Sequence, residues 1–140
     1  MKICISQLRY FFREYNKKYF NGILPMPFFE IIHTHKIFGR FECYTDRNSC
    51  TEPVIKMSDG FEYTDEQLRD VLVHEMIHFY LAYTGKDRKV THGKKFKQMM
   101  NEMNETYNLN IMIEYNGNDF YKFEIDNPFK KTIKKLLGIS

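Results

Sequence analysis

The chain has little of several residue types on which common fold classes depend. Its 140 residues include no Trp, three Cys, four Pro and seven Gly. The cysteines are odd in number and form no Cys-x-x-Cys pair, which excludes a disulfide-stapled secreted fold and a four-cysteine zinc ribbon within this chain. The glycines occur singly, so the sequence has no phosphate-binding loop and no dinucleotide fingerprint.

Long apolar segments are also missing. No run approaches the roughly eighteen apolar residues that a membrane span needs. Gln7, Arg9 and Arg13 interrupt the N-terminal segment before it reaches the length of a signal peptide. We therefore expect a soluble, cytoplasmic protein with no membrane partner. The 21 Lys and Arg exceed the 18 Asp and Glu by three, which permits an anionic partner without requiring one.

What the chain does have is aromatic rings, 13 Phe and 10 Tyr, at spacings that predict regular elements. Apolar spacing and turn residues predict helices over residues 6–20, 64–84 and 93–107, strands over 28–34, 38–45 and 54–58, a hairpin over 111–125, and a short basic helix over 128–137. This order predicts an α+β fold in which helices pack on a short three-stranded sheet. No linker divides the chain, so we expect one domain over residues 1–140 with its core at about 6–107.

The predicted second helix contains the run His74-Glu75-Met76-Ile77-His78. Residues four apart on an α-helix share one face, so the two imidazoles can reach one Zn²⁺. Glu75 lies one step round the helix, where its carboxylate can take a proton from a metal-bound water without being a ligand. The pattern predicts a zinc hydrolase site with Glu75 as its general base.

A catalytic zinc takes three protein ligands, and His92 is the first candidate for the third. It lies fourteen residues after His78, at the head of the next predicted helix, and a turn through residues 85–91 can bring that helix back against the second. Glu102 and Glu105 on the third helix are carboxylate alternatives. His33 and His35 alternate along a predicted strand and more often mark an exposed strand edge than a metal site.

Beyond this motif the chain resembles the SprT-like (Spartan-type) metalloproteases. The resemblance rests on four segments in the family's order and spacing: residues 16–25, Gly39 with the strand 54–58, residues 72–78, and residues 92–96. It covers about residues 8–107. It implies a zincin-like, zinc-dependent protease domain with His74, His78 and His92 as ligands and Glu75 as base, acting on protein substrates. Characterised members of the family act in DNA–protein crosslink repair.

The resemblance also raises the question of DNA. Many members of the family follow the protease core with a cysteine-ligated zinc subdomain, but no cysteine follows Cys50 here, so residues 108–140 lack a zinc ribbon. A basic segment next to His92 and the C-terminal lysines could still bind DNA phosphates. The members of the first segment are Lys86, Arg88, Lys89, Lys94, Lys95 and Lys97. The alternative function is a weakly active or inactive zinc-containing module that binds nucleic acid or acts as an adaptor.

Overall fold

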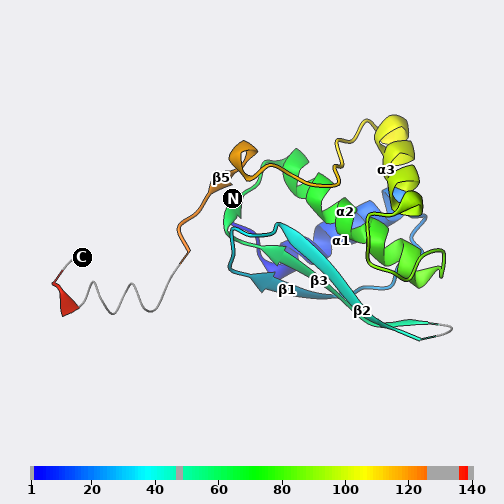
Figure 1. Ribbon diagram of the computed structural model, residues 1–140, viewed down its shortest axis with the longest axis horizontal. Helices are drawn as coiled ribbons and strands as arrows, with labels where there is room; N and C mark the ends of the chain where they lie inside the picture. Colours follow the sequence, from blue (N-terminus) through cyan, green and yellow to red (C-terminus); the bar gives the residue numbers. More distant parts are fainter. Residues whose placement is uncertain (1, 47–48, 126–135, 139–140) are drawn as a thin grey trace.

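The computed structural model describes residues 2–46, 49–125 and 136–138 of the chain. Within them, helices cover one face of a small sheet, as the α+β prediction requires (Figure 1). The three main helices are α1 (Ile5–Tyr19), α2 (Asp65–Tyr83) and α3 (Lys94–Tyr107). The sheet contains β1 (Phe28–Ile32), β2 (Gly39–Thr45) and β3 (Cys50–Ser58). The three main helices and the three strands are therefore present in the predicted order.

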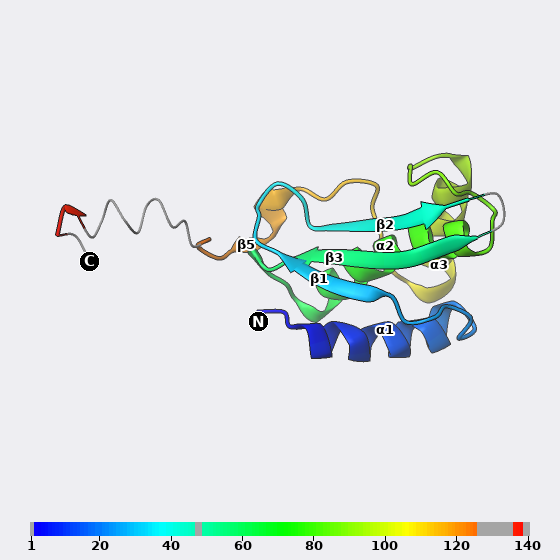
Figure 2. The ribbon, with the colours of Figure 1, turned by 90° about the horizontal axis from the view of Figure 1, so that it is seen from below.

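The sheet has the order β1-β3-β2, so β2 is an edge strand. β1 runs parallel to β3, with Phe28 opposite Val54, whereas β2 is antiparallel to β3, with Phe41 opposite Ile55. The pairing of β2 shifts register between Glu42 and Tyr44, which is typical of a β-bulge. Figure 2 shows the three strands side by side, with α1 running beside β1.

Aromatic rings join the helical layer to the sheet. Phe79 of α2 stacks on Phe41 of β2 at 5.3 Å and on Phe12 of α1 at 6.3 Å between ring centroids. All three side chains are fully buried. These three rings join α1, α2 and β2 in one buried contact, which holds α2 over β2. The contact thereby places the face of α2 that contains the metal motif beside the edge strand.

The prediction for residues 111–125 was wrong in its pairing. Tyr121–Lys122 (β5) does form an antiparallel pair, but with Phe61–Glu62 (β4) and not with residues 111–115. Asn104 explains the difference, because its side-chain amide donates to the Ile111 carbonyl at 2.9 Å and its side-chain oxygen accepts from the Ile111 N–H at 2.8 Å. The Asn116-Gly117 turn signal begins a 3-10 helix over Gly117–Asp119.

Most of the predicted basic helix over residues 128–137 lies outside the described residues. Among the helices that the structure describes, none has both the length and the apolar character needed to cross a membrane.

Candidate metal centre

Helix α2 supplies three of the four residues of the predicted site. It begins with a capping box, in which the Gln67 N–H donates to Thr64 Oγ1 at 3.1 Å and the Thr64 N–H donates to Gln67 Oε1 at 3.0 Å. Farther along, His74 and His78 lie four residues apart, with ring centroids 5.2 Å apart. Both imidazoles are buried, so the helix directs them into the protein and not into solvent.

His92 reaches the same place from the segment between α2 and α3. Gly85, with φ +73°, ends α2 in the left-handed conformation, and the Asp87 N–H donates to the Leu81 carbonyl at 3.1 Å, so the chain folds back. His92 Nε2 lies 3.0 Å from His74 Nε2. One nitrogen from each of the three histidines lies within 4.8 Å of the others, forming a cluster that can hold a metal ion.

A fully buried phenylalanine packs against all three histidines of this cluster. Phe96, in the first turns of α3, has its ring 4.4 Å from His78, 4.8 Å from His74 and 4.9 Å from His92, between centroids. One apolar side chain therefore contacts all three imidazoles.

The donors fit zinc. Two nitrogens bound to one tetrahedral Zn²⁺ at about 2.05 Å are about 3.3 Å apart, close to the 3.0 Å between His74 and His92. The Nδ1–H of His74 donates to the Met112 carbonyl at 2.7 Å. Because a carbonyl only accepts, this bond fixes the tautomer that leaves Nε2 free to bind a metal, the usual arrangement around a metal-ligating histidine.

Burial keeps the imidazoles in the neutral form that binds metal. It lowers the pKa of His74 to about 4 and the pKa of His78 to about 3, with neighbouring histidines adding to the effect on His78. Burial also lowers the pKa of His92. At pH 7 the cluster therefore presents nitrogen lone pairs without first having to release protons.

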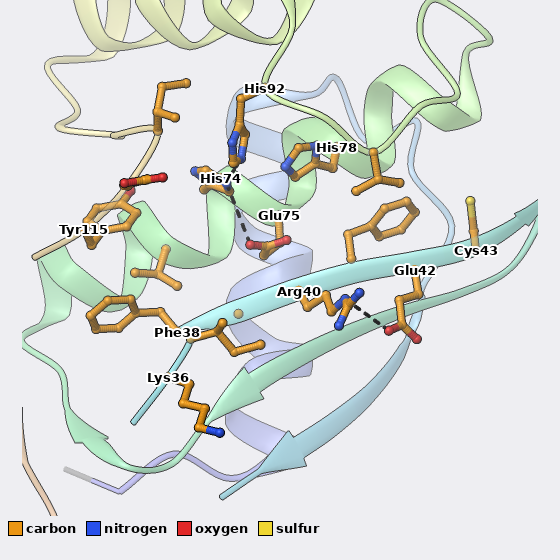
Figure 3. A pocket seen from close by; sticks show the side chains of 17 residues that line it. Lys36, Phe38, Arg40, Glu42, Cys43, His74, Glu75, His78, His92 and Tyr115 are labelled. Carbon is orange, nitrogen blue, oxygen red and sulfur yellow. Dashed lines mark hydrogen bonds and ion pairs between the residues drawn. The ribbon is translucent and has the colours of Figure 1, made fainter. Parts of the chain in front are cut away.

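Glu75 is a buried carboxylate beside the cluster, with Oε1 3.9 Å from His74 Nε2 (Figure 3). Burial raises its pKa to about 8, and the positive charge of Arg40 opposes the shift. Gly39 of β2 passes directly over this side chain, because a Cβ placed on Gly39 would lie 3.2 Å from Glu75 Cγ. The edge strand and the carboxylate are therefore in close contact.

The cluster opens into a cavity of about 700 Å³. Three segments surround it: residues 36–43, which include most of β2, the histidine face of α2, and residues 113–115 (Figure 3). Lys36 and Arg40 add positive charge to its wall, and Glu42 and Glu114 add negative charge. The cavity combines three imidazole nitrogens that can hold a metal ion, the buried carboxyl group of Glu75 and the edge strand β2.

A family model described as the SprT-like family matches residues 8–115. The chain belongs to the SprT-like family. A search of curated proteins returned no match. The match ends at Tyr115, eight residues beyond the resemblance seen in the sequence, and so it includes Met112, whose carbonyl orients His74.

The other candidate ligands of this SprT-like chain lie elsewhere. Glu102 accepts a hydrogen bond from Gln98 at 3.3 Å and lines a separate cavity with Tyr80 and Lys86. His33 binds the Asp59 carboxylate through Nδ1 at 2.8 Å, and His35 Nε2 donates to the Phe123 carbonyl at 2.7 Å. Of the described residues, neither this pair nor the third-helix carboxylates joins a cluster of three possible ligands.

Several residues that shape the site of this SprT-like protein were not predicted. Met112 and Tyr115 gave no signal, since every residue has a backbone carbonyl and tyrosines are ordinary core residues. Phe96 lies in a segment of the family resemblance, but its contact with all three imidazoles was not predicted. Tyr115 accepts a hydrogen bond from the Met112 N–H at 3.1 Å and so holds the residue that orients His74. Gly39 was part of the family resemblance, but its contact with Glu75 follows only from the fold.

Proposed function

We propose that the chain is a zinc-dependent peptidase that hydrolyses peptide bonds in protein substrates. One observation supports this most strongly: three neutral imidazoles converge within 4.8 Å beside a buried carboxylate that faces a cavity of about 700 Å³. Three nitrogen ligands leave one position of a tetrahedral metal open to the cavity, as catalytic zinc sites require. Membership of the SprT-like family supports the same function.

In this proposal, His74, His78 and His92 hold the ion, which when bound supplies Lewis acidity for a carbonyl and for water. Glu75 takes the proton from the attacking water and gives it to the leaving amine. Its pKa of about 8 without metal suits a group that must both accept and release a proton near neutral pH. Contact with Gly39 holds Glu75 in place, and contact with Phe96 holds the histidines in place.

The edge strand favours an extended polypeptide as substrate. The Ser58 N–H donates to the Phe38 carbonyl at 2.8 Å, so in the antiparallel pairing Phe38 and Arg40 direct their backbone groups toward β3. Gly39 and Phe41 then direct theirs away from the sheet, along the cavity. A substrate strand can add to such an edge through main-chain hydrogen bonds. These bonds depend on the extended conformation of the substrate more than on its amino-acid sequence.

The decisive experiment compares zinc content and cleavage of a casein substrate in the parent and in Glu75→Gln. We expect about one Zn²⁺ in both proteins, because glutamine keeps the shape of the side chain and Glu75 is not a ligand. Hydrolysis should fall by about 10²–10⁴-fold in the variant, the usual contribution of a general base. Equal cleavage by both proteins would show that Glu75 is not the base.

The third ligand is tested in the same assay. His92→Ala should lose zinc, whereas Glu102→Ala, the matched change on α3, should retain it, because Glu102 faces Gln98 and a separate cavity. The reverse result would reject His92 as a ligand. A parent protein that binds zinc but cleaves neither casein nor DNA-bound protein would favour the alternative, an inactive zinc-containing adaptor or nucleic-acid-binding module.

A second proposed feature is DNA binding by the basic segment beside His92, with DNA-crosslinked proteins as the substrates. Lys89, Lys94 and Lys97 are exposed, and within the described part of the chain their ammonium groups make no ion pair. Three other cations of the segment have local partners: Lys86 donates to Tyr80 Oη at 3.2 Å, Lys95 donates to the Lys86 carbonyl, and Arg88 packs against Gly85. The lysines at 130, 131, 134 and 135 lie outside the described residues.

A further inference from the structure

A row of charged side chains crosses the outer face of the sheet, the face away from the core. Glu30 of β1 lies opposite Lys56 of β3, and Lys56 lies opposite Arg40 of β2. Glu42 follows two residues after Arg40 and so points to the same side of the strand. Ile55, the neighbour of Lys56, is fully buried in the core, so the charged row faces the other way.

The ion pairs of this row leave Arg40 as its least neutralised cation. Lys56 Nζ lies near two carboxylates, 3.1 Å from Glu42 and 3.8 Å from Glu30. Among the described residues, Arg40 forms an ion pair only with Glu42, through Nε at 3.3 Å, and it shares this carboxylate with Lys56. The Arg40 side chain is 64% exposed, against 25% for Lys56. The terminal N–H donors of its guanidinium are therefore open to a further anion.

Arg40 also lies at the edge to which a substrate strand can add. Its backbone groups bond to β3, whereas Gly39 and Phe41 present theirs to the outside. In an antiparallel strand bonded to these two residues, the residue opposite Arg40 lies in a non-hydrogen-bonded pair, in which the two side chains come closest. Figure 3 shows Arg40 on β2 beside the cavity that contains Glu75. Substrate side chains on either side of that position face the cavity, because side chains alternate along a strand.

We propose that Arg40 is a specificity-determining residue, which favours substrate segments that have Asp or Glu at the position opposite it. A carboxylate there forms a charge-assisted pair with the free side of the guanidinium, whose planar donors match its two oxygens. A lysine or arginine at the same position meets the like charges of Arg40 and Lys56, which is unfavourable between facing strands. The inference rests on the proposed function, since it takes the edge of β2 as the place of the substrate strand.

The test measures peptide binding by the zinc-loaded Glu75→Gln variant of the full chain, which should bind without cleaving. The probes are labelled ten-residue peptides of Thr, Ser and Gln, in which a single Glu is moved along the peptide one position at a time. Fluorescence anisotropy gives the Kd of each peptide. At the best position we expect Glu to tighten binding about threefold relative to Gln, the scale of one cross-strand charge pair, and Lys to weaken it.

Three variants, each combined with Glu75→Gln, assign this preference. Arg40→Glu should reverse it, so that Lys binds more tightly than Glu at the same peptide position. Arg40→Gln should abolish the preference without reversing it, and it places no acid beside Glu42. Arg13→Glu is the matched control, because Arg13 is exposed on α1 at the opposite edge of the sheet, and it should keep the parent preference. The changed side chains are all exposed, so the melting temperatures should stay close to that of the parent.

Several results would overturn the proposal. These are no binding of any peptide, equal affinity for Glu, Gln and Lys at every position, and a preference that survives Arg40→Glu. Loss of the preference in Lys36→Glu but not in Arg40→Glu would assign it to Lys36, the other cation of the cavity wall. Because binding is measured without cleavage, a parent protein that cleaves casein but shows no preference loses only this inference. A protein that shows the preference but cleaves nothing loses only the proposed peptidase activity.

Discussion

The Glu75 side chain fits beside strand β2 because residue 39 is a glycine. A Cβ on Gly39 would lie 3.2 Å from Glu75 Cγ and 3.1 Å from Met57 Sδ, closer than most Cβ atoms come to their neighbours. Gly39 does not have a positive φ, so an alanine there is a question of space and not of backbone strain. The glycine therefore lets the edge strand pass close to the proposed base without displacing it.

Gly39→Ala should therefore impair hydrolysis more than stability. The added methyl group would move the Glu75 side chain by a few tenths of an ångström, and we expect kcat/KM to fall on the order of tenfold because catalysis is sensitive to such misplacement. The free energy of unfolding should fall by only about 1 kcal/mol, as for modest overpacking. Steady-state kinetics and urea denaturation of the same preparation measure the two effects.

Gly117→Ala is the matched control for this change. A Cβ on Gly117 would meet only Lys122, at 3.7 Å from Cε, which is an ordinary contact. The control should retain parent activity. Full activity in Gly39→Ala would show that the strand does not fix the position of Glu75.

At the scale of elements, α2 is the scaffold of the site. It provides His74, Glu75 and His78, contacts β2 and β3 with one side and α3 with another, and is buried along most of its length. Its start is fixed by the capping box at Thr64 and Gln67, and Gln67 Nε2 also donates to the Asp119 carbonyl at 2.9 Å. The cap thus links the beginning of α2 to the C-terminal part of the described chain.

We expect Thr64→Ala to lower stability without disturbing the chemistry. Loss of a threonine N-cap typically costs about 1 kcal/mol, which for a domain of this size lowers the melting temperature by about 4 °C. Zinc content should not change, because His74 lies nearly three turns from the cap and is held by tertiary contacts. Calorimetry and metal analysis test both expectations.

Thr84→Ala provides the comparison at the other end of α2. The Thr84 hydroxyl donates to the Tyr80 carbonyl at 2.7 Å, but the Thr84 N–H already donates to the same oxygen at 3.0 Å. Its removal should therefore change the melting temperature little. If the two variants have equal melting temperatures, the capping box does not contribute as we propose.

For the whole molecule, charge is distributed unevenly. Helix α1 and the segment over residues 86–97, which extends into α3, are both basic, while the chain as a whole has a net charge of only +3. The segment adjoins His92 and the metal cavity, whereas α1 lies at the opposite edge of the sheet. Positive charge is therefore present both beside the metal cavity and at the opposite edge of the sheet.

The proposed binding of duplex DNA by residues 86–97 is tested by replacing Lys89, Lys94 and Lys97 with Ala. Each phosphate contact contributes about −0.9 to the slope of log affinity against log salt on a duplex, so the slope should flatten by about 2–3. Zinc content should be unchanged, and DNA-stimulated cleavage should fall. The double variant Lys2→Ala with Lys122→Ala changes lysines near the N-terminus and in β5, two parts of the chain that Figure 1 shows at the other end of the molecule, and it should keep the parent slope. A slope unaffected by the triple variant would remove this segment from DNA binding.

The sequence by itself determined the features that depend on local spacing. Helix α2 and its capping box followed from residues at most four positions apart, and so did the placement of His74 and His78 on one face. The α+β order of elements and the family were also predicted correctly. Such features follow from sequence because helical periodicity and caps are properties of short segments.

Only the tertiary structure decided how distant segments meet. The Asn116-Gly117 signal is local and suggested a hairpin, but Asn104 hydrogen bonds with Ile111 and so holds the preceding segment away from β5. The same segment then places the Met112 carbonyl on His74, while Gly39 comes to lie over Glu75. These contacts join residues 36–38 positions apart, and no local spacing encodes them, since they depend on packing the whole chain around one core.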